Sequence, residues 1–204
     1  MKIKRITPGF SCANTYIVYD ENTNDGVMID PGGMAEKLLT ESQGIKIKYI
    51  ILTHAHFDHI GALEEVAEKT GAQVVIHELE ASSLTDSRYN LCGLAGVPEN
   101  SREADKMVCD GQELLVGTIS LKFIHTPGHT KGGMCIFVND EILITGDTLF
   151  NGSIGRSDFE GGDYNTLISS IEKIICLDEK IKIYPGHGEE STIGFEKHTN
   201  PYII

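Results

Sequence analysis

The feature that most constrains the fold is a cluster of four potential metal ligands directly after an apolar run. The run Tyr49–Thr53 is almost wholly apolar, as expected of a strand that is buried on both faces. It is followed by His54, His56, Asp58 and His59, where a helical pattern begins. Packing does not explain four such side chains within six residues, whereas strand ends in α/β proteins are where binding sites gather. We therefore expect a metal site at the end of a buried strand.

The spacing within this cluster predicts more than one metal ion. His54 and His56 are two residues apart, so in an extended segment both can face the same ion. Asp58 and His59 come after the turn and can face a second ion. A catalytic zinc site uses about three protein ligands and a water molecule. Further ligands must therefore come from other parts of the chain.

Three more candidate ligands follow β-rich runs through tight Gly or Pro turns. His129 and His187 each end a Pro-Gly-His triplet, and Asp147 follows a glycine. Together the chain offers seven ligands, enough for three on each ion and one carboxylate that can bridge through its two oxygens. The same pattern recurs at four strand ends, which indicates metal binding. A structural role is expected for the remaining histidines, which are His77, His125 and His198.

Strands and helices alternate along the chain, which predicts one α/β domain over residues 1–204. The expected strands are short apolar or alternating runs between turn residues, and they span 3–7, 15–19, 27–29, 49–53, 74–76, 113–116, 119–125, 134–138, 141–145 and 181–184. The expected helices have apolar residues at helical spacing, and they span 34–43, 59–69 and 163–176. Residues 86–106 lack a clear period, and we expect a surface loop with some short helix near the site.

The charge balance disfavours several classes of partner. Lys and Arg total 17 and Asp and Glu total 30, so the net charge is −13. This repels phosphate backbones and anionic lipid, and neither nucleic acid nor membrane is expected as a partner. Without a signal peptide or a membrane-spanning run, a cytoplasmic location is expected. The five cysteines show no paired spacing, which predicts reduced, mostly buried thiols.

Taken together, the motifs resemble the metallo-β-lactamase superfamily, and most of all its small glyoxalase II-like thioester hydrolases (hydroxyacylglutathione hydrolases). The resemblance rests on His-x-His-x-Asp-His at 54–59, Pro-Gly-His-Thr at 127–130, Gly-Asp-Thr-Leu-Phe at 146–150 and Pro-Gly-His-Gly at 185–188. It implies a four-layer αβ/βα sandwich with the site at one edge of two sheets. It also implies two divalent metal ions, zinc foremost with iron or manganese as alternatives, and hydrolysis of a small acyl-thiol substrate.

The resemblance further implies a role for each ligand. One ion would be held by His54, His56 and His129, the other by Asp58, His59 and His187, and Asp147 would bridge them. Asp58 would also act as a catalytic residue that orients the nucleophile. Arg156 matches a basic residue that lies near the glutathione part of the substrate in glyoxalase II-like relatives, so it is a candidate substrate-binding residue. Pairing of Arg156 with Asp158 or Asp163 is the alternative.

Differences from related enzymes of the superfamily disfavour some of the possible activities. The zinc β-lactamases carry a cysteine at the position of Asp147 and usually lack a histidine at the position of His59. Full-length glyoxalase II has a C-terminal helical domain that contacts glutathione, and this chain is expected to be too short for it. The tyrosine that such enzymes carry after the last histidine ligand is absent from residues 188–191. Hydrolysis is therefore better supported than glutathione as the thiol carrier.

Two other functions stay open. A persulfide dioxygenase on the same scaffold would use one ferrous iron held by His54, His129 and Asp147, and such enzymes share a Gly-Arg-x-Asp-Phe segment like 155–159. Their first motif typically carries alanine where this chain has Phe57, which argues against this function. A non-catalytic metal-binding module is the other alternative, and the retention of all seven ligands disfavours it. The sequence carries no signal for the oligomeric state.

Overall fold

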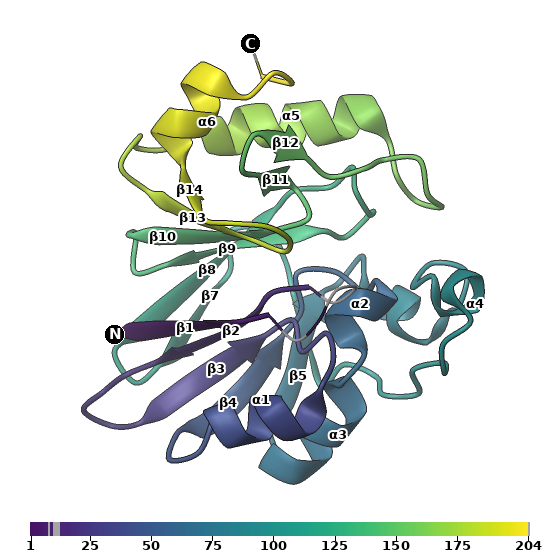
Figure 1. The fold of residues 1–204 in the computed structure, drawn as a ribbon, viewed down its shortest axis with the longest axis vertical. Helices are drawn as coiled ribbons and strands as arrows, with labels where there is room; N and C mark the ends of the chain where they lie inside the picture. The colour runs from purple at the N-terminus through teal and green to yellow at the C-terminus, as the bar shows by residue number, and fades with distance from the viewer. Residues whose placement is uncertain (8, 10–12, 204) are drawn as a thin grey trace.

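The computed structural model describes residues 1–7, 9 and 13–203, and two six-stranded sheets pack face to face within them (Figure 1). The first sheet follows the order of the sequence: β1 (Lys2–Ile6), β2 (Thr15–Tyr19), β3 (Asp25–Ile29), β4 (Lys46–Ile51), β5 (Gln73–His77) and β6 (Lys106–Val108). The second sheet has the order β14-β13-β10-β9-β8-β7: β7 (Glu113–Val116), β8 (Ile119–His125), β9 (Met134–Val138), β10 (Ile142–Gly146), β13 (Lys182–Pro185) and β14 (Ser191–Thr192).

Helices cover the outer face of each sheet. α1 (Ala35–Glu41) and α3 (Leu63–Thr70) pack on the first sheet. α5 (Tyr164–Ile175) and α6 (Ile193–Thr199) pack on the second, at the opposite side of the molecule in Figure 1. The layers therefore run helix, sheet, sheet, helix, which confirms the expected α/β class and the four-layer αβ/βα sandwich.

The alternation of side chains along each strand builds this layering. In β2, Tyr16 and Val18 point into the apolar core between the sheets, whereas Ile17 points into the core beneath α1 and α3. In β10, Ile144 faces the inner core and Leu143 faces α5. Both faces of a strand are thus buried, because successive side chains point to opposite sides of a sheet. This explains why the strands appear as nearly unbroken apolar runs in the sequence.

Parallel strands within each sheet end at the same edge of that sheet. β3, β4 and β5 are mutually parallel in the first sheet, and β10 is parallel to β13 in the second. Neighbouring parallel strands end on the same side, so the residues that follow them are brought together. Met134 N, at the start of β9, donates to Thr53 O after β4, which joins the two sheets directly at this edge.

The helix expected over 59–69 is two helices. α2 (Phe57–Ile60) ends at Gly61, and α3 begins at Leu63. At the interruption the backbone of Gly32 lies so close that a Cβ on Gly61 would overlap its carbonyl oxygen. Ala62 N donates to Pro31 O instead of continuing the helical ladder.

Several short elements were not expected. They are the hairpin of β11 (Leu149–Phe150) and β12 (Ser153–Ile154), the edge strands β6 and β14, and the helix α6. The loop 86–106 contains the short helix α4 (Cys92–Ala95), as expected, and the 3-10 turn η1 (Ala81–Thr85) precedes it. No helix in the described part of the chain is long and apolar enough to cross a membrane.

The cysteines are only partly as predicted. Those that the structure describes are free thiols, and Cys12 lies outside the described residues. Cys92 and Cys135 are buried, but Cys109 and Cys176 are exposed, so the expectation of mostly buried thiols is wrong for these two.

Candidate metal centre

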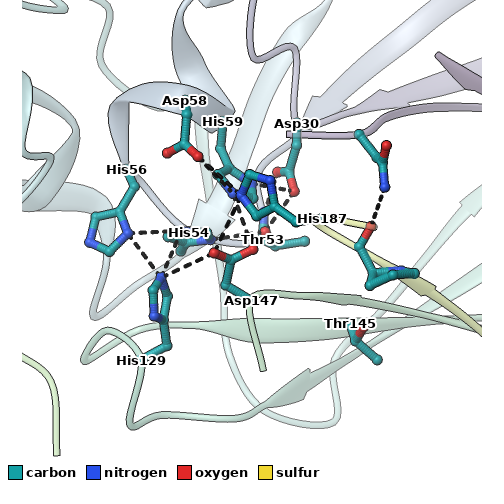
Figure 2. A network of polar contacts seen from close by, with 12 residues as sticks. Asp30, Thr53, His54, His56, Asp58, His59, His129, Thr145, Asp147 and His187 are labelled. Carbon is teal, nitrogen blue, oxygen red and sulfur yellow. Dashed lines mark hydrogen bonds and ion pairs between the residues drawn. The ribbon is translucent and has the colours of Figure 1, made fainter. Parts of the chain in front are cut away.

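All seven candidate ligands converge at one edge of the two sheets, although they come from four separate strand ends (Figure 2). His54, His56, Asp58 and His59 follow β4 of the first sheet, the last two within α2. The second sheet supplies the other three ligands, which follow β8, β10 and β13 and are His129, Asp147 and His187. The structure thus brings together every residue that the sequence proposed as a ligand.

Three imidazole rings form the first group. His54 Nε2 lies 3.1 Å from His56 Nδ1 and 3.2 Å from His129 Nε2, and the last two atoms are 2.9 Å apart. All three side chains are buried. Nitrogen atoms bound to a single tetrahedral zinc ion at about 2.1 Å would be separated by roughly 3.4 Å, close to this triangle. The group therefore has the size of one coordination sphere.

Asp58, His59 and His187 form the second group. His187 Nε2 lies 3.1 Å from Asp58 Oδ2, and His59 Nε2 lies 3.9 Å from the same oxygen. The His59 side chain is fully buried, whereas the His187 side chain is 39% exposed. This side of the site therefore opens toward solvent.

Asp147 lies between the two groups, with one oxygen facing His59 and the other facing His129 and His187. Its Oδ1 is 3.3 Å from His59 Nε2, and its Oδ2 is 3.6 Å from both His129 Nε2 and His187 Nε2. Burial alone would raise the pKa of this carboxyl, but the surrounding histidines, His59 foremost, hold it well below its ordinary value. The carboxylate is thus ionised at neutral pH and has contacts with both groups.

The histidines of the first group are held neutral. Burial, together with the charges of neighbouring rings, lowers the pKa of His54 well below its ordinary value and that of His56 to about 3. Burial also lowers the pKa of His129. A neutral imidazole has one ring nitrogen without a proton, and a metal ion binds to this nitrogen.

The donors also fit metal ions because two of them have no other partner. His59 Nε2 and Asp147 Oδ1 are buried and make no hydrogen bond within the described part of the chain. Buried polar atoms are rarely left without a partner unless a water or an ion completes the site. Imidazole nitrogens with carboxylate oxygens suit zinc, iron and manganese.

Asp30 supports the centre and was missed by the sequence analysis. It directly follows β3, beside β4, and its carboxylate accepts hydrogen bonds from Thr53 N (2.8 Å) and Thr53 Oγ1 (2.7 Å). Its Oδ2 also lies 3.0 Å from His59 Nδ1. A carboxylate at this nitrogen favours the tautomer with a proton on Nδ1, which leaves His59 Nε2 free for a metal ion. The only signal in the sequence was an acidic residue at the end of the neighbouring strand.

Glu80 links two of the ligand loops and was also missed. Its carboxylate accepts from Ala55 N (3.1 Å), between two histidine ligands, and from Gly132 N (2.8 Å), after His129. The side chain is buried, and burial raises the pKa of the Glu80 carboxyl while these backbone donors lower it. Glu80 therefore joins a loop of the first sheet to a loop of the second.

Two glycines allow the loops to approach so closely. A Cβ on Gly132 would lie 2.6 Å from the Glu80 Cβ, and one on Gly186 would overlap Asp147 Oδ1. Real Cβ atoms do not make such contacts, so a larger residue at either position would force the loops apart.

A cavity of about 610 Å³ lies over the centre and is bounded by five of the seven ligands. Residues of α4 and of the β11–β12 hairpin form its remaining walls with Phe57, Phe159 and Arg156. The expectation that the loop 86–106 lies near the site is thus confirmed. Arg156 is also at the cavity, and its guanidinium makes two hydrogen bonds of 2.7 Å to Asp158, so the expected pairing with Asp158 is present. Substrate binding by Arg156 stays a prediction.

The other histidines lie outside the three groups of candidate ligands that the described residues form. His77 stacks on His125 with ring centroids 4.2 Å apart, and the His198 side chain, 65% exposed, lies 3.5 Å from Glu179. These positions agree with the structural role expected for them.

The chain is similar in sequence to a known protein family and to several known proteins. The model of the metallo-β-lactamase superfamily matches residues 9–187. The probable metallo-hydrolase YqgX of Bacillus subtilis is 38% identical over 208 residues, covering 100% of this chain and 98% of the relative. The hydroxyacylglutathione hydrolase GloC of Haemophilus influenzae is 35% identical over 200 residues, covering 93% and 92%.

Two solved structures have the same fold over nearly the whole chain. The BLEG-1 B3 metallo-β-lactamase superposes with a TM-score of 0.93 at 36% identity, covering 99% of both chains. TTHA1623 in a di-iron-bound form superposes with a TM-score of 0.85 at 31% identity, covering 98% of this chain and 99% of that one.

Proposed function

The chain belongs to the metallo-β-lactamase superfamily, and from this membership we propose that it is a dinuclear metal-dependent hydrolase of thioesters. Membership supports a metal-dependent hydrolase, and the similarity to a hydroxyacylglutathione hydrolase favours a thioester as the bond that is cleaved. Zinc is the proposed metal, with iron as the alternative because one structural relative is di-iron-bound.

The observation that carries the proposal is the position of Asp147 between two complete groups of donors. The three-histidine group and the group of Asp58, His59 and His187 each offer three ligands, and Asp147 contacts both groups: its Oδ1 lies near His59, and its Oδ2 lies near both His129 and His187. This arrangement matches two adjacent ions that share one carboxylate. We assign the seven ligands accordingly, with Asp147 as the bridge.

When bound, the two metal ions would lower the pKa of a water molecule toward neutrality and stabilise negative charge on the carbonyl oxygen. The protein positions the attacking water and gives the substrate access to the metal centre. The Asp58 carboxylate, held beside His187, can also accept a hydrogen bond from the attacking water and orient it. The cavity gives the substrate carbonyl a path to the ligands from one side. A departing thiolate needs little protonation at neutral pH, so no separate general acid is required.

The mononuclear persulfide dioxygenase is a weaker candidate on the same residues. It would use His54, His129 and Asp147, but His56 Nδ1 lies 2.9 Å from His129 Nε2 and therefore belongs to the same group. The second group, Asp58, His59 and His187, would then hold no metal ion although its donors are also complete. Two ions explain both groups.

Hydrolysis of thioesters by reconstituted protein tests the proposal. Samples loaded with zinc and with ferrous iron are assayed with S-lactoylglutathione and with the acetyl thioester of N-acetylcysteamine, and nitrocefin serves as a β-lactam comparator. We expect thioester turnover that falls at least about a hundredfold in His56→Ala, since even the loss of an outer partner of a metal ligand costs up to that much. His198→Ala, at an exposed histidine outside the site, is the matched control.

Two results would contradict thioester hydrolysis, and each would point to a different activity. Fully metallated protein that cleaves nitrocefin but neither thioester would assign it to β-lactam hydrolysis. Oxygen consumption with a persulfide in the iron-loaded sample, without thioester turnover, would favour the dioxygenase.

A further inference from the structure

The walls of the cavity above the metal centre are apolar on two sides. Leu91, Leu94 and Ala95 line it from α4 and the residue before it, and Phe150 and Ile154 line it from the β11–β12 hairpin. Leu94 is 73% exposed and faces this cavity. Apart from the metal ligands, the polar side chain at this cavity is that of Arg156.

The guanidinium of Arg156 is paired with a carboxylate. Its Nε and Nη2 donate to the two oxygens of Asp158, each at 2.7 Å, and the guanidinium lies 3.7 Å from the centroid of the Phe159 ring. The Asp158 carboxylate thus offsets the positive charge of Arg156 at the cavity and occupies the Nε/Nη2 edge of the guanidinium. The described residues offer no second Lys or Arg at this cavity, and residues 8, 10–12 and 204 include no Lys, Arg or His in the sequence.

From these walls and this charge balance we propose that the cavity is a subsite for an uncharged aliphatic chain, so that the substrates are thioesters of short fatty acids rather than acidic thioesters such as S-lactoylglutathione. The inference rests on the proposed thioester hydrolysis and adds the class of acyl group. An aliphatic chain would enter between α4 and the hairpin and bury the exposed face of Leu94. Glutathione carries two carboxylates, and these would meet apolar walls and a protein of net charge −13.

A series of acyl chains on one neutral carrier tests the subsite. Acetyl, butanoyl and hexanoyl thioesters of N-acetylcysteamine are compared with S-lactoylglutathione on the metallated protein. Each methylene that becomes buried adds up to about fourfold in binding, so kcat/KM is expected to rise about two- to fourfold for each methylene added. S-lactoylglutathione is expected to be a poorer substrate than the hexanoyl thioester.

Leu94→Ala provides the residue-level test. Because Leu94 is exposed, its truncation leaves the fold intact, and kcat/KM for the hexanoyl thioester is expected to fall about fivefold with that for the acetyl thioester unchanged. Leu115→Ala is the matched control, because Leu115 is similarly exposed at 70% but lies on β7, outside the cavity. Calorimetric binding of S-hexyl-N-acetylcysteamine, which has no scissile bond, is expected to weaken in the first variant and not in the second.

The outcomes separate this inference from the function on which it rests. Efficient hydrolysis of S-lactoylglutathione with no dependence on acyl length would overturn the aliphatic subsite and leave thioester hydrolysis standing. A rise with chain length that Leu94→Ala does not reduce would also overturn it, since the chain would then bind elsewhere. No turnover of any thioester would overturn the proposed function, and the absence of S-hexyl-N-acetylcysteamine binding in that case would overturn the subsite as well.

Discussion

At the scale of single residues, the proposed metal centre depends most on Asp147. Its carboxylate contacts both groups of donors, with Oδ1 at 3.3 Å from His59 and Oδ2 at 3.6 Å from both His129 and His187. Asp147→Ala removes the ligand that both ions would share, so we expect metal content to fall from two ions to one or fewer, with loss of activity. Elemental analysis of the purified variant measures this. Asp178→Ala, at an exposed aspartate outside the site, should keep the wild-type content, and two ions retained in Asp147→Ala would exclude the bridge.

Asp30 acts on the metal centre through His59. Asp30→Asn removes the charge beside His59 Nδ1 and weakens the fixation of the ring and its tautomer. Outer partners of this kind typically contribute 10- to 100-fold in metal affinity, so we expect a loss of about that size. A competition titration against a chromophoric chelator measures the affinity. Unchanged affinity in a folded variant would show that the His59 ring is oriented without this carboxylate.

The sequence predicted the seven candidate ligands but not the residues that support them. The ligands were recognisable because four of them form one cluster after a strand and the other three follow strands in motifs with Gly or Pro, as with His129 and His187. Asp30 also follows a strand, but no neighbouring histidine marks it, and the roles of Asp30 and Glu80 arise because folding places them beside Thr53, Ala55 and Gly132. Contacts between segments distant in the sequence leave little trace in a single sequence.

At the scale of elements, the centre depends on loops that approach each other without room for a side chain. The segment after β5 reaches the loop between β8 and β9 through Glu80 and Gly132. Gly132→Ala places a Cβ against the Glu80 side chain and backbone, so we expect a loss of about 1–3 kcal/mol in the free energy of unfolding. Denaturation with urea measures this.

Gly93→Ala provides the control for that measurement. Gly93 lies in helix α4, and a Cβ there would make only ordinary contacts, from 3.4 Å outward. Its effect should stay within about 0.5 kcal/mol. Equal stabilities of Gly132→Ala and the wild type would show that the two loops can separate without cost.

The elements themselves were predicted where they are long and periodic. Apart from β6 and β14, the strands of both sheets follow apolar patterns that the sequence displays, and so does helix α5. The break between α2 and α3 was not predicted, because it involves a contact between distant segments, in which Ala62 N donates to Pro31 O. The β11–β12 hairpin and β14 have two residues in each strand, too few to show a period.

At the scale of the whole molecule, the centre joins the two halves of the sandwich. The first sheet supplies four candidate ligands and the second supplies three, so bound metal ions would cross-link them (Figure 2). Ligands that bind only the folded state stabilise it, by about 2.7 kcal/mol when free metal is a hundredfold above its Kd. For a chain of this size this corresponds to a rise in Tm of about 5–10 °C, so removal of metal with a chelator should lower Tm by that amount. Differential scanning calorimetry measures the shift, and identical Tm values with and without metal would contradict the cross-link.

The number of metal ions that bind to each chain tests the dinuclear centre. The metal-free protein is titrated with zinc, and bound metal is determined by elemental analysis after removal of the excess, with thioester hydrolysis followed in the same samples. We expect binding to saturate at two ions per chain and hydrolysis to reach its maximum as the second ion binds. Saturation at one ion per chain, with full activity at that point, would contradict a dinuclear hydrolase.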